Sequence, residues 1–84
     1  MKKLELLKNK IKYRSMYRGT KEMDILLSSF VVSVINSFSI LELQDLEVFL
    51  NCEDEDIYSF YKSNKNIKSF NNKKILELFK NHKI

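Results

Sequence analysis

The sequence of 84 residues has no proline, no tryptophan, one glycine and one cysteine. Tight turns depend on glycine and proline, so a fold of many strands is disfavoured and helices joined by short polar loops are expected. Cys52 alone cannot form an internal disulfide or a multi-cysteine zinc site. We interpret it as a small buried hydrophobic side chain in a reducing compartment.

Histidine is equally scarce. The only one, His82, lies thirty residues after Cys52, so a Cys/His metal site or nucleophile pair has little support. We expect His82 to lie among frayed C-terminal residues. The sequence also lacks a phosphate-binding glycine loop, an HExxH motif and a convincing pair of catalytic carboxylates. We therefore expect neither an enzyme nor a protein with a metal or stably bound cofactor of its own.

Long hydrophobic runs are missing too. The longest, at residues 30–32, is bounded by Ser29 and Ser33 and is far short of the ~20 residues that span a bilayer. The first five residues lack the apolar core of a signal peptide. We expect a soluble, unprocessed, cytoplasmic protein without membrane insertion.

The chain does have 44% hydrophobic residues, including six Phe and four Tyr. That is enough for one core in a chain near the lower size limit of an independent domain, so residues 1–84 are expected to form a single domain. Charge is segregated: residues 1–21 carry +7, residues 22–56 carry −9 and residues 57–84 carry +6. Such segregation can draw basic and acidic elements together within the fold or present opposite faces to a partner.

Hydrophobic periodicity predicts a first helix over residues 3–17, where Leu4, Leu7 and Ile11 share a face. It ends towards Gly19, which suits a residue with positive φ at the close of a helix. A basic helix of this kind can also lie on an anionic membrane, but its apolar face is too thin for that to be preferred over packing.

The second helix has the clearest pattern. Thr20 is expected to cap it, and Ile25 and Val32 widen its stripe as a central helix contacted on several sides requires. The hydrophobic residues that repeat at helical spacing are Met23, Leu26, Leu27, Phe30, Val31, Val34, Ile35 and Phe38.

Three shorter helices are expected after it. Ser39 and Glu42 form a capping-box pattern ahead of a third helix that runs to Leu50. Asp54 is expected to cap a fourth helix through Tyr61, and Asn71 or Asn72 a last helix that frays beyond Lys80. The acidic residues 53–56 lack the ligand spacing of an EF-hand, so capping explains them better than calcium. The predicted fold is all-α, a single compact bundle of about five short helices.

The junction around Gly19 contains glycine and charged residues that packing of the core does not require. A residue without a side chain lets another molecule approach the backbone closely. Arg18 and Glu22 lie four residues apart, which on a helix sets them side by side as an ion pair. An ordinary helix junction with a solvated pair is the alternative interpretation.

This junction resembles the succinate dehydrogenase assembly factor 2 family, the small flavinator proteins of bacteria and mitochondria. The family signature Arg-Gly-x-x-Glu-x-Asp stands here as residues 18–24, and residues 46–60 resemble the family's helix, acidic turn and Asp-Leu-Tyr/Phe segment. Tyr17 replaces the usual second arginine, Thr20 a common methionine, and Phe60 a frequent tryptophan. The resemblance covers residues 13–61 well.

The resemblance implies a bacterial assembly factor that binds the flavoprotein subunit of succinate dehydrogenase, or that of fumarate reductase, and promotes covalent attachment of FAD to it. It would act on the partner's FAD, and we expect it to be a monomer when free. The residues implied in partner binding are Arg14, Tyr17, Arg18, Gly19, Glu22 and Asp24.

Two other functions stay open. An antitoxin-like or other protein-interaction module is the first alternative. A small DNA-binding helical bundle is the second, but the helix after Gly19 is mostly apolar and begins with acids that repel phosphate, so no nucleic-acid partner is expected.

Overall fold

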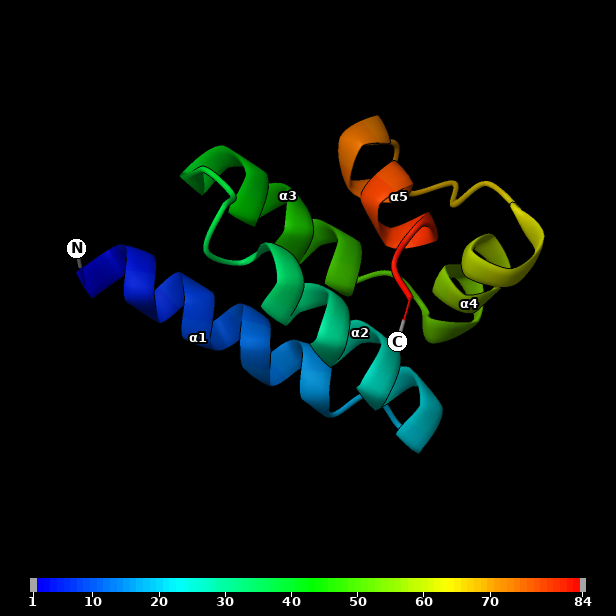
Figure 1. Ribbon diagram of the computed structural model, residues 1–84, viewed down its shortest axis with the longest axis horizontal. Coiled ribbons are helices and arrows are strands. Elements are labelled where there is room, and N and C mark those ends of the chain that lie inside the picture. The colour runs from blue at the N-terminus through cyan, green and yellow to red at the C-terminus, as the bar shows by residue number, and fades with distance from the viewer. Residues whose placement is uncertain (1, 84) are drawn as a thin grey trace.

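The computed structural model describes residues 2–83, and every regular element in this range is a helix (Figure 1). The five-helix prediction is confirmed. The helices are α1 (Lys2–Met16), α2 (Lys21–Val34), α3 (Ile40–Leu50), α4 (Asp54–Ser63) and α5 (Lys73–Lys80).

The first three helices lie side by side, and α1 packs along both α2 and α3 (Figure 1). The shorter helices α4 and α5 pack on each other at the end of the molecule away from the N-terminus. The described chain measures 38 × 26 × 21 Å along its principal axes. The junction between α1 and α2 therefore lies at the same end as the start of α4.

Aromatic side chains fill the centre of the core. Phe30, Phe49 and Phe79 come from α2, α3 and α5, and their ring centroids lie 5.1 to 6.3 Å apart with edge-to-face planes. All three are buried, as is Ile11 of α1. These rings therefore serve core packing.

Helix starts follow local hydrogen-bonding chemistry. Thr20 Oγ1 accepts from the backbone N–H of Met23, and Asn72 makes the corresponding contact at α5. Ser39 and Glu42 form both halves of a capping box at α3. These three predicted starts are confirmed, with Asn72 rather than Asn71 as the cap.

The predicted cap of α4 is wrong. Glu53 occupies the N-cap position without a side-chain cap, and Asp54 is already the first residue of the helix. The Asp54 carboxylate binds Arg18 instead. A carboxylate in the first turn of a helix still interacts favourably with the positive end of the helix dipole.

Two expectations about α2 and the C-terminus are also wrong. Ile25 and Val32 are exposed, so they do not widen the buried stripe of α2 as expected. His82 is partly buried: its ring packs edge-on against Phe30, and its carbonyl accepts from the Tyr61 hydroxyl at 2.8 Å. These contacts tie the last described residues to the core.

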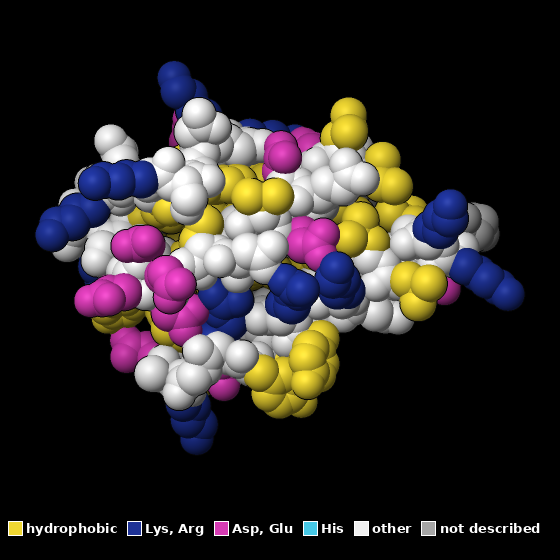
Figure 2. Space-filling view, turned by 180° about the vertical axis from the view of Figure 1, so that it is seen from behind, with side chains coloured by type: hydrophobic (Ala, Val, Ile, Leu, Met, Phe, Trp, Pro, Cys, Tyr) yellow, Lys and Arg dark blue, Asp and Glu magenta, His cyan; other side chains and the backbone are white. Residues whose placement is uncertain are grey.

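The segregated charges meet within the fold. Three ion pairs join a basic end of the sequence to its acidic middle: Lys10 with Glu47 at 2.7 Å, Arg18 with Asp54 at 2.7 Å, and Lys74 with Glu42. Figure 2 shows acidic side chains gathered at one end of a face, next to a row of basic ones. Cys52 is buried and free, as expected. None of the helices within residues 2–83 combines the length and apolarity needed to cross a membrane.

Candidate functional site

The turn between α1 and α2 is fixed by its backbone. Gly19 has φ +118°, in the left-handed region that side chains disfavour, so the prediction of positive φ is confirmed. It stands three residues after the end of α1, in the turn itself. A Cβ added to Gly19 would meet no atom within 4 Å. Glycine is needed here for the backbone angle, and the space beside it is open.

Asp24 holds the turn from the α2 side. Its Oδ1 accepts the backbone N–H of Arg18, six residues earlier. Asp24 lies in the first turn of α2, where its charge also complements the helix dipole. The turn is therefore folded back onto the start of α2.

The side chain of Arg18 holds the same turn from the opposite side. Its guanidinium donates to the carbonyls of Leu50 at 2.6 Å and Cys52 at 3.1 Å, and more weakly to that of Arg14 at 3.3 Å. Carbonyls at a helix C-terminus have no partner within the helix, so an arginine satisfies groups that α3 cannot.

Asp54 completes the shell around this guanidinium. Its Oδ1 accepts from Arg18 Nε at 2.8 Å and lies 2.7 Å from Nη2. The Arg18 side chain is only 11% exposed and that of Asp54 30%. Arg18 thus joins the end of α1, the end of α3 and the start of α4.

The expected Arg18–Glu22 ion pair does not form. Arg18 lies in the turn before α2, so the four-residue spacing does not place the two side chains on one helical surface. Glu22 Oε1 instead accepts from the Tyr58 hydroxyl of α4 at 3.1 Å. This hydrogen bond raises the pKa of Tyr58 above its ordinary value.

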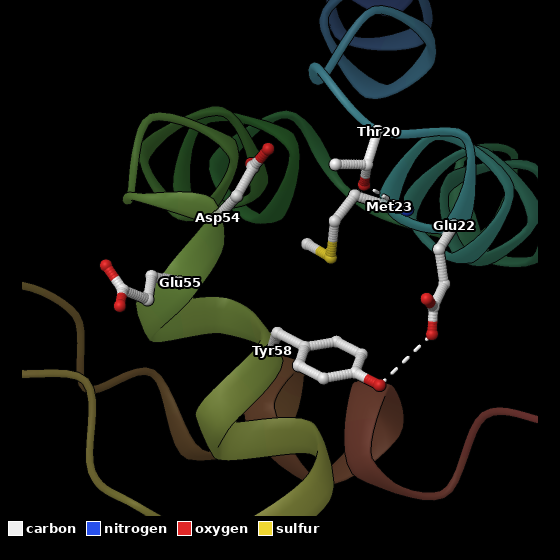
Figure 3. Close-up of a pocket in the computed structure, with 6 residues that line it drawn as sticks. All are labelled: Thr20, Glu22, Met23, Asp54, Glu55 and Tyr58. Carbon is white, nitrogen blue, oxygen red and sulfur yellow. Dashed lines mark hydrogen bonds between the residues drawn. The ribbon is translucent and has the colours of Figure 1, made fainter.

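A shallow pocket opens between the starts of α2 and α4 (Figure 3). Its volume is about 230 Å³, and it is lined by Thr20, Glu22, Met23, Asp54, Glu55 and Tyr58. The Tyr58 ring lies across one side of the pocket with its hydroxyl pointing to Glu22, and the Met23 side chain points into the space between them. The pocket has an apolar floor and acidic rims.

A second, more polar depression lies on the other side of the Arg18–Asp54 pair. It has a volume of about 390 Å³, and its lining includes Tyr17, Asn51 and Glu53. Tyr17 is 67% exposed and its ring lies 4.8 Å from that of Tyr13, while Arg14 donates to the side chain of Asn51. Both faces of the junction are therefore open to another molecule.

All six residues expected at the site lie at this junction, but in two positions. Arg18 and Asp24 are turned inward and hold the turn, whereas Tyr17 and Glu22 are exposed and Arg14 is partly exposed around Gly19. Sequence reasoning missed the contribution of three residues at or just after the other end of the acidic block, which are Asn51, Asp54 and Tyr58. The charge segregation was the signal that could have indicated an acidic partner for Arg18.

Among residues 2–83 no group of three or more His, Cys, Asp and Glu side chains is arranged to hold a metal ion. The site presents hydrogen-bonding groups, charged side chains and the open space beside Gly19. These features suit a binding surface.

Comparison with known proteins gives a family. The family model described as Sdh5, flavinator of succinate dehydrogenase, matches residues 9–83. The mitochondrial succinate dehydrogenase assembly factor 2 of Dictyostelium discoideum is 29% identical over 79 residues, covering 94% of this chain and 56% of its own length. The chain thus spans little more than half of that relative. No solved structure matches it. The family match over most of the chain, together with the Arg-Gly-x-x-Glu junction built as described above, places this protein in the Sdh5 family of succinate dehydrogenase flavinators.

Proposed function

We propose that this protein binds the flavoprotein subunit of succinate dehydrogenase and promotes covalent attachment of FAD to that subunit. The family match supports the partner and the reaction. The observation that carries the proposal is the Gly19 turn, which Arg18 and Asp24 hold from within while its outer side is open. A turn held in this way can accept a partner's backbone without first being ordered.

The exposed residues contact the partner, and the inward residues position them. Gly19 gives close approach, Glu22 supplies a carboxylate beside it, and Tyr17 and Arg14 border the contact. Arg18 and Asp24 act through the turn that they fix. Tyr58 belongs to this surface as well, since its hydroxyl holds the Glu22 carboxylate.

The protein is an assembly factor and leaves the bond-forming chemistry to the flavin and the flavoprotein. Binding favours the flavoprotein conformation in which the accepting side chain and the flavin are aligned, and alignment alone removes a large part of a reaction barrier. FAD belongs to the partner, and this chain is a monomer that binds none stably. A reducing compartment such as the bacterial cytoplasm suits its free Cys52.

The test mixes the protein with FAD and the flavoprotein subunit from the same organism. Covalent flavin is followed as fluorescence of the denatured subunit in a gel. Wild type should accelerate the attachment, and Gly19→Arg and Glu22→Ala should lose most of the acceleration. Glu77→Ala is the matched control, because Glu77 is an exposed carboxylate on α5, outside the junction.

The outcomes separate clearly. If folded wild-type protein leaves the rate of attachment unchanged, the proposed function is wrong. If wild type accelerates attachment and Gly19→Arg does so equally well, the function stands and the junction is not its site.

A further inference from the structure

Exposed hydrophobic side chains stand along the second half of α1, the turn after it and α2. Among residues 2–83, ten large hydrophobic side chains are exposed, and half of them lie in this part of the chain, between residues 13 and 32. They are Tyr13, Met16, Tyr17, Ile25 and Val32, which we call the seam strip. Met16 and Val32 line a groove between the two helices, whereas Tyr17 lines the polar depression at the end of α3. Single exposed hydrophobic residues are normal, whereas a gathered set indicates a surface for contact.

The centre of the seam strip is concave. A groove of about 270 Å³ runs between the two helices, lined by Lys12, Ser15, Met16, Ser28 and Val32. Both serine hydroxyls are turned back to carbonyls of their own helices, Ser15 to Lys12 at 2.7 Å and Ser28 to Ile25 at 3.4 Å. The walls of the groove are consequently mostly apolar although serines line it.

The seam strip is continuous with the junction. Met16 ends α1 directly before Tyr17, and Ile25 follows Asp24 in α2. The Tyr17 ring packs at a tilt against that of Tyr13, which lies three residues before Met16 on the same helix. Hydrophobic side chains protrude at the lower edge of the face in Figure 2, beside the row of basic ones. Met16, which lines the groove, is three residues from Gly19, so a partner seated on Gly19 would lie close to one end of the groove.

We propose that the seam strip is a second contact surface for the same flavoprotein subunit, and that the groove takes an apolar side chain from it. This inference rests on the proposed function. Lys12 gives the groove a basic border. The complementary segment of the flavoprotein is accordingly an apolar residue flanked by carboxylates. An apolar anchor in a groove, next to a polar contact around Gly19, is a common division of labour within an interface.

Val32 gives the sharpest test because it is 67% exposed and does not belong to the core. Val32→Glu places a charge in the groove, and Val32→Leu keeps the apolar character. Leu41→Glu is the matched control, since Leu41 is 71% exposed in the first turns of α3 and does not line the groove. Circular dichroism and urea unfolding confirm that each variant is folded.

Affinity for the purified flavoprotein subunit is measured by calorimetry, with and without FAD. We expect Val32→Glu to weaken binding by about tenfold or more, as loss of a buried anchor does, while Val32→Leu and Leu41→Glu bind like wild type. If wild type binds and Val32→Glu binds equally tightly, the inference is overturned and the proposed function stands. If wild type itself does not bind the subunit, both fail.

The same variants also test two other occupants of the seam strip, a second copy of this chain and an anionic membrane surface. Light scattering over a range of concentrations detects self-association, and sedimentation with vesicles containing anionic lipid detects a membrane surface. A dimer or vesicle binding that Val32→Glu abolishes, with flavoprotein binding unchanged, would assign the seam strip to that occupant and overturn the proposal.

Discussion

Arg18 and Asp54 are 36 residues apart in sequence, yet two nitrogens of the arginine lie within 2.8 Å of one carboxylate oxygen of the aspartate. The same guanidinium reaches the carbonyls of Leu50 and Cys52. The arginine of the family signature is therefore occupied inside this molecule. Its contribution to binding is expected to come through the shape of the Gly19 turn.

We predict that Arg18→Ala lowers the free energy of unfolding by about 2 kcal/mol. Removal of the partly buried guanidinium leaves several hydrogen-bond acceptors without a partner. Urea denaturation measures this. Lys10→Ala is the control: its ion pair with Glu47 is 54% exposed on the lysine side, so the loss should stay below about 1 kcal/mol. Equal losses for the two variants would contradict the structural role of Arg18. Arg18→Lys should recover only part of the loss, since an ammonium cannot reproduce the fork of the guanidinium.

Variants of Gly19 separate the effect of backbone strain on stability from the effect of a blocked surface on flavinylation. Gly19→Ala should cost about 1–2 kcal/mol of stability through its positive φ, with no clash added. Gly19→Arg should unfold at a similar urea concentration, because the space beside Gly19 is open. In the flavinylation assay, however, the arginine variant should be far less active than the alanine variant. Activities that simply follow the two stabilities would show that the glycine serves the turn alone.

Tyr58→Phe tests whether the Glu22 carboxylate must be held. The variant removes the 3.1 Å hydrogen bond and leaves the ring in the pocket, so the unfolding midpoint should change little. We expect slower flavinylation than with wild type but faster than with Glu22→Ala. Tyr61→Phe is the control, since its hydroxyl bonds the His82 carbonyl away from the junction. A Tyr58→Phe protein as active as wild type would exclude this hydroxyl from the site.

His82 gives a prediction on pH. Burial lowers its pKa below the ordinary 6.5, and its Nε2 lies 2.8 Å from Ser29 Oγ. The folded state therefore binds fewer protons than the unfolded state between the folded pKa and 6.5. Stability should be complete above pH 6.5 and fall as the pH drops from 6.5 to the folded pKa.

Proton NMR resolves this titration cleanly because the sequence has one histidine. The His82→Asn variant should lose the pH dependence of stability in this range. A folded-state pKa at or above 6.5 would contradict the packing of the ring against Phe30.

Local features of this fold could be predicted from sequence because they depend on neighbours in the chain. The caps at Thr20, Ser39 and Asn72 each bond the residue three positions later in the chain. The positive φ of Gly19 could be expected because that residue is a glycine. The five helices follow from hydrophobic periodicity in the same way. The expected position of the site came from the resemblance to the family signature and stays a prediction.

The partners of the site residues could not be predicted, because they depend on packing between distant elements. Four-residue spacing favoured Glu22 as the partner of Arg18, whereas the end of α3 and the start of α4 supply better acceptors. Asp54 was likewise predicted to cap its own helix, because sequence patterns consider only nearby residues and not its contact with Arg18. Periodicity counted Ile25 and Val32 as core residues, but nothing in it specifies which sides of α2 are covered.

The Arg18–Asp54 contact also has a consequence for synthesis. A ribosome that has made only the first two helices has already synthesised the whole Arg-Gly-x-x-Glu-x-Asp segment, but not residues 50–58, which fix the shape of its turn. Nascent and truncated chains therefore carry the signature without the geometry. On the proposed function, we therefore expect the flavoprotein to bind only chains that already contain residues 50–58, so that shorter nascent chains do not compete for it.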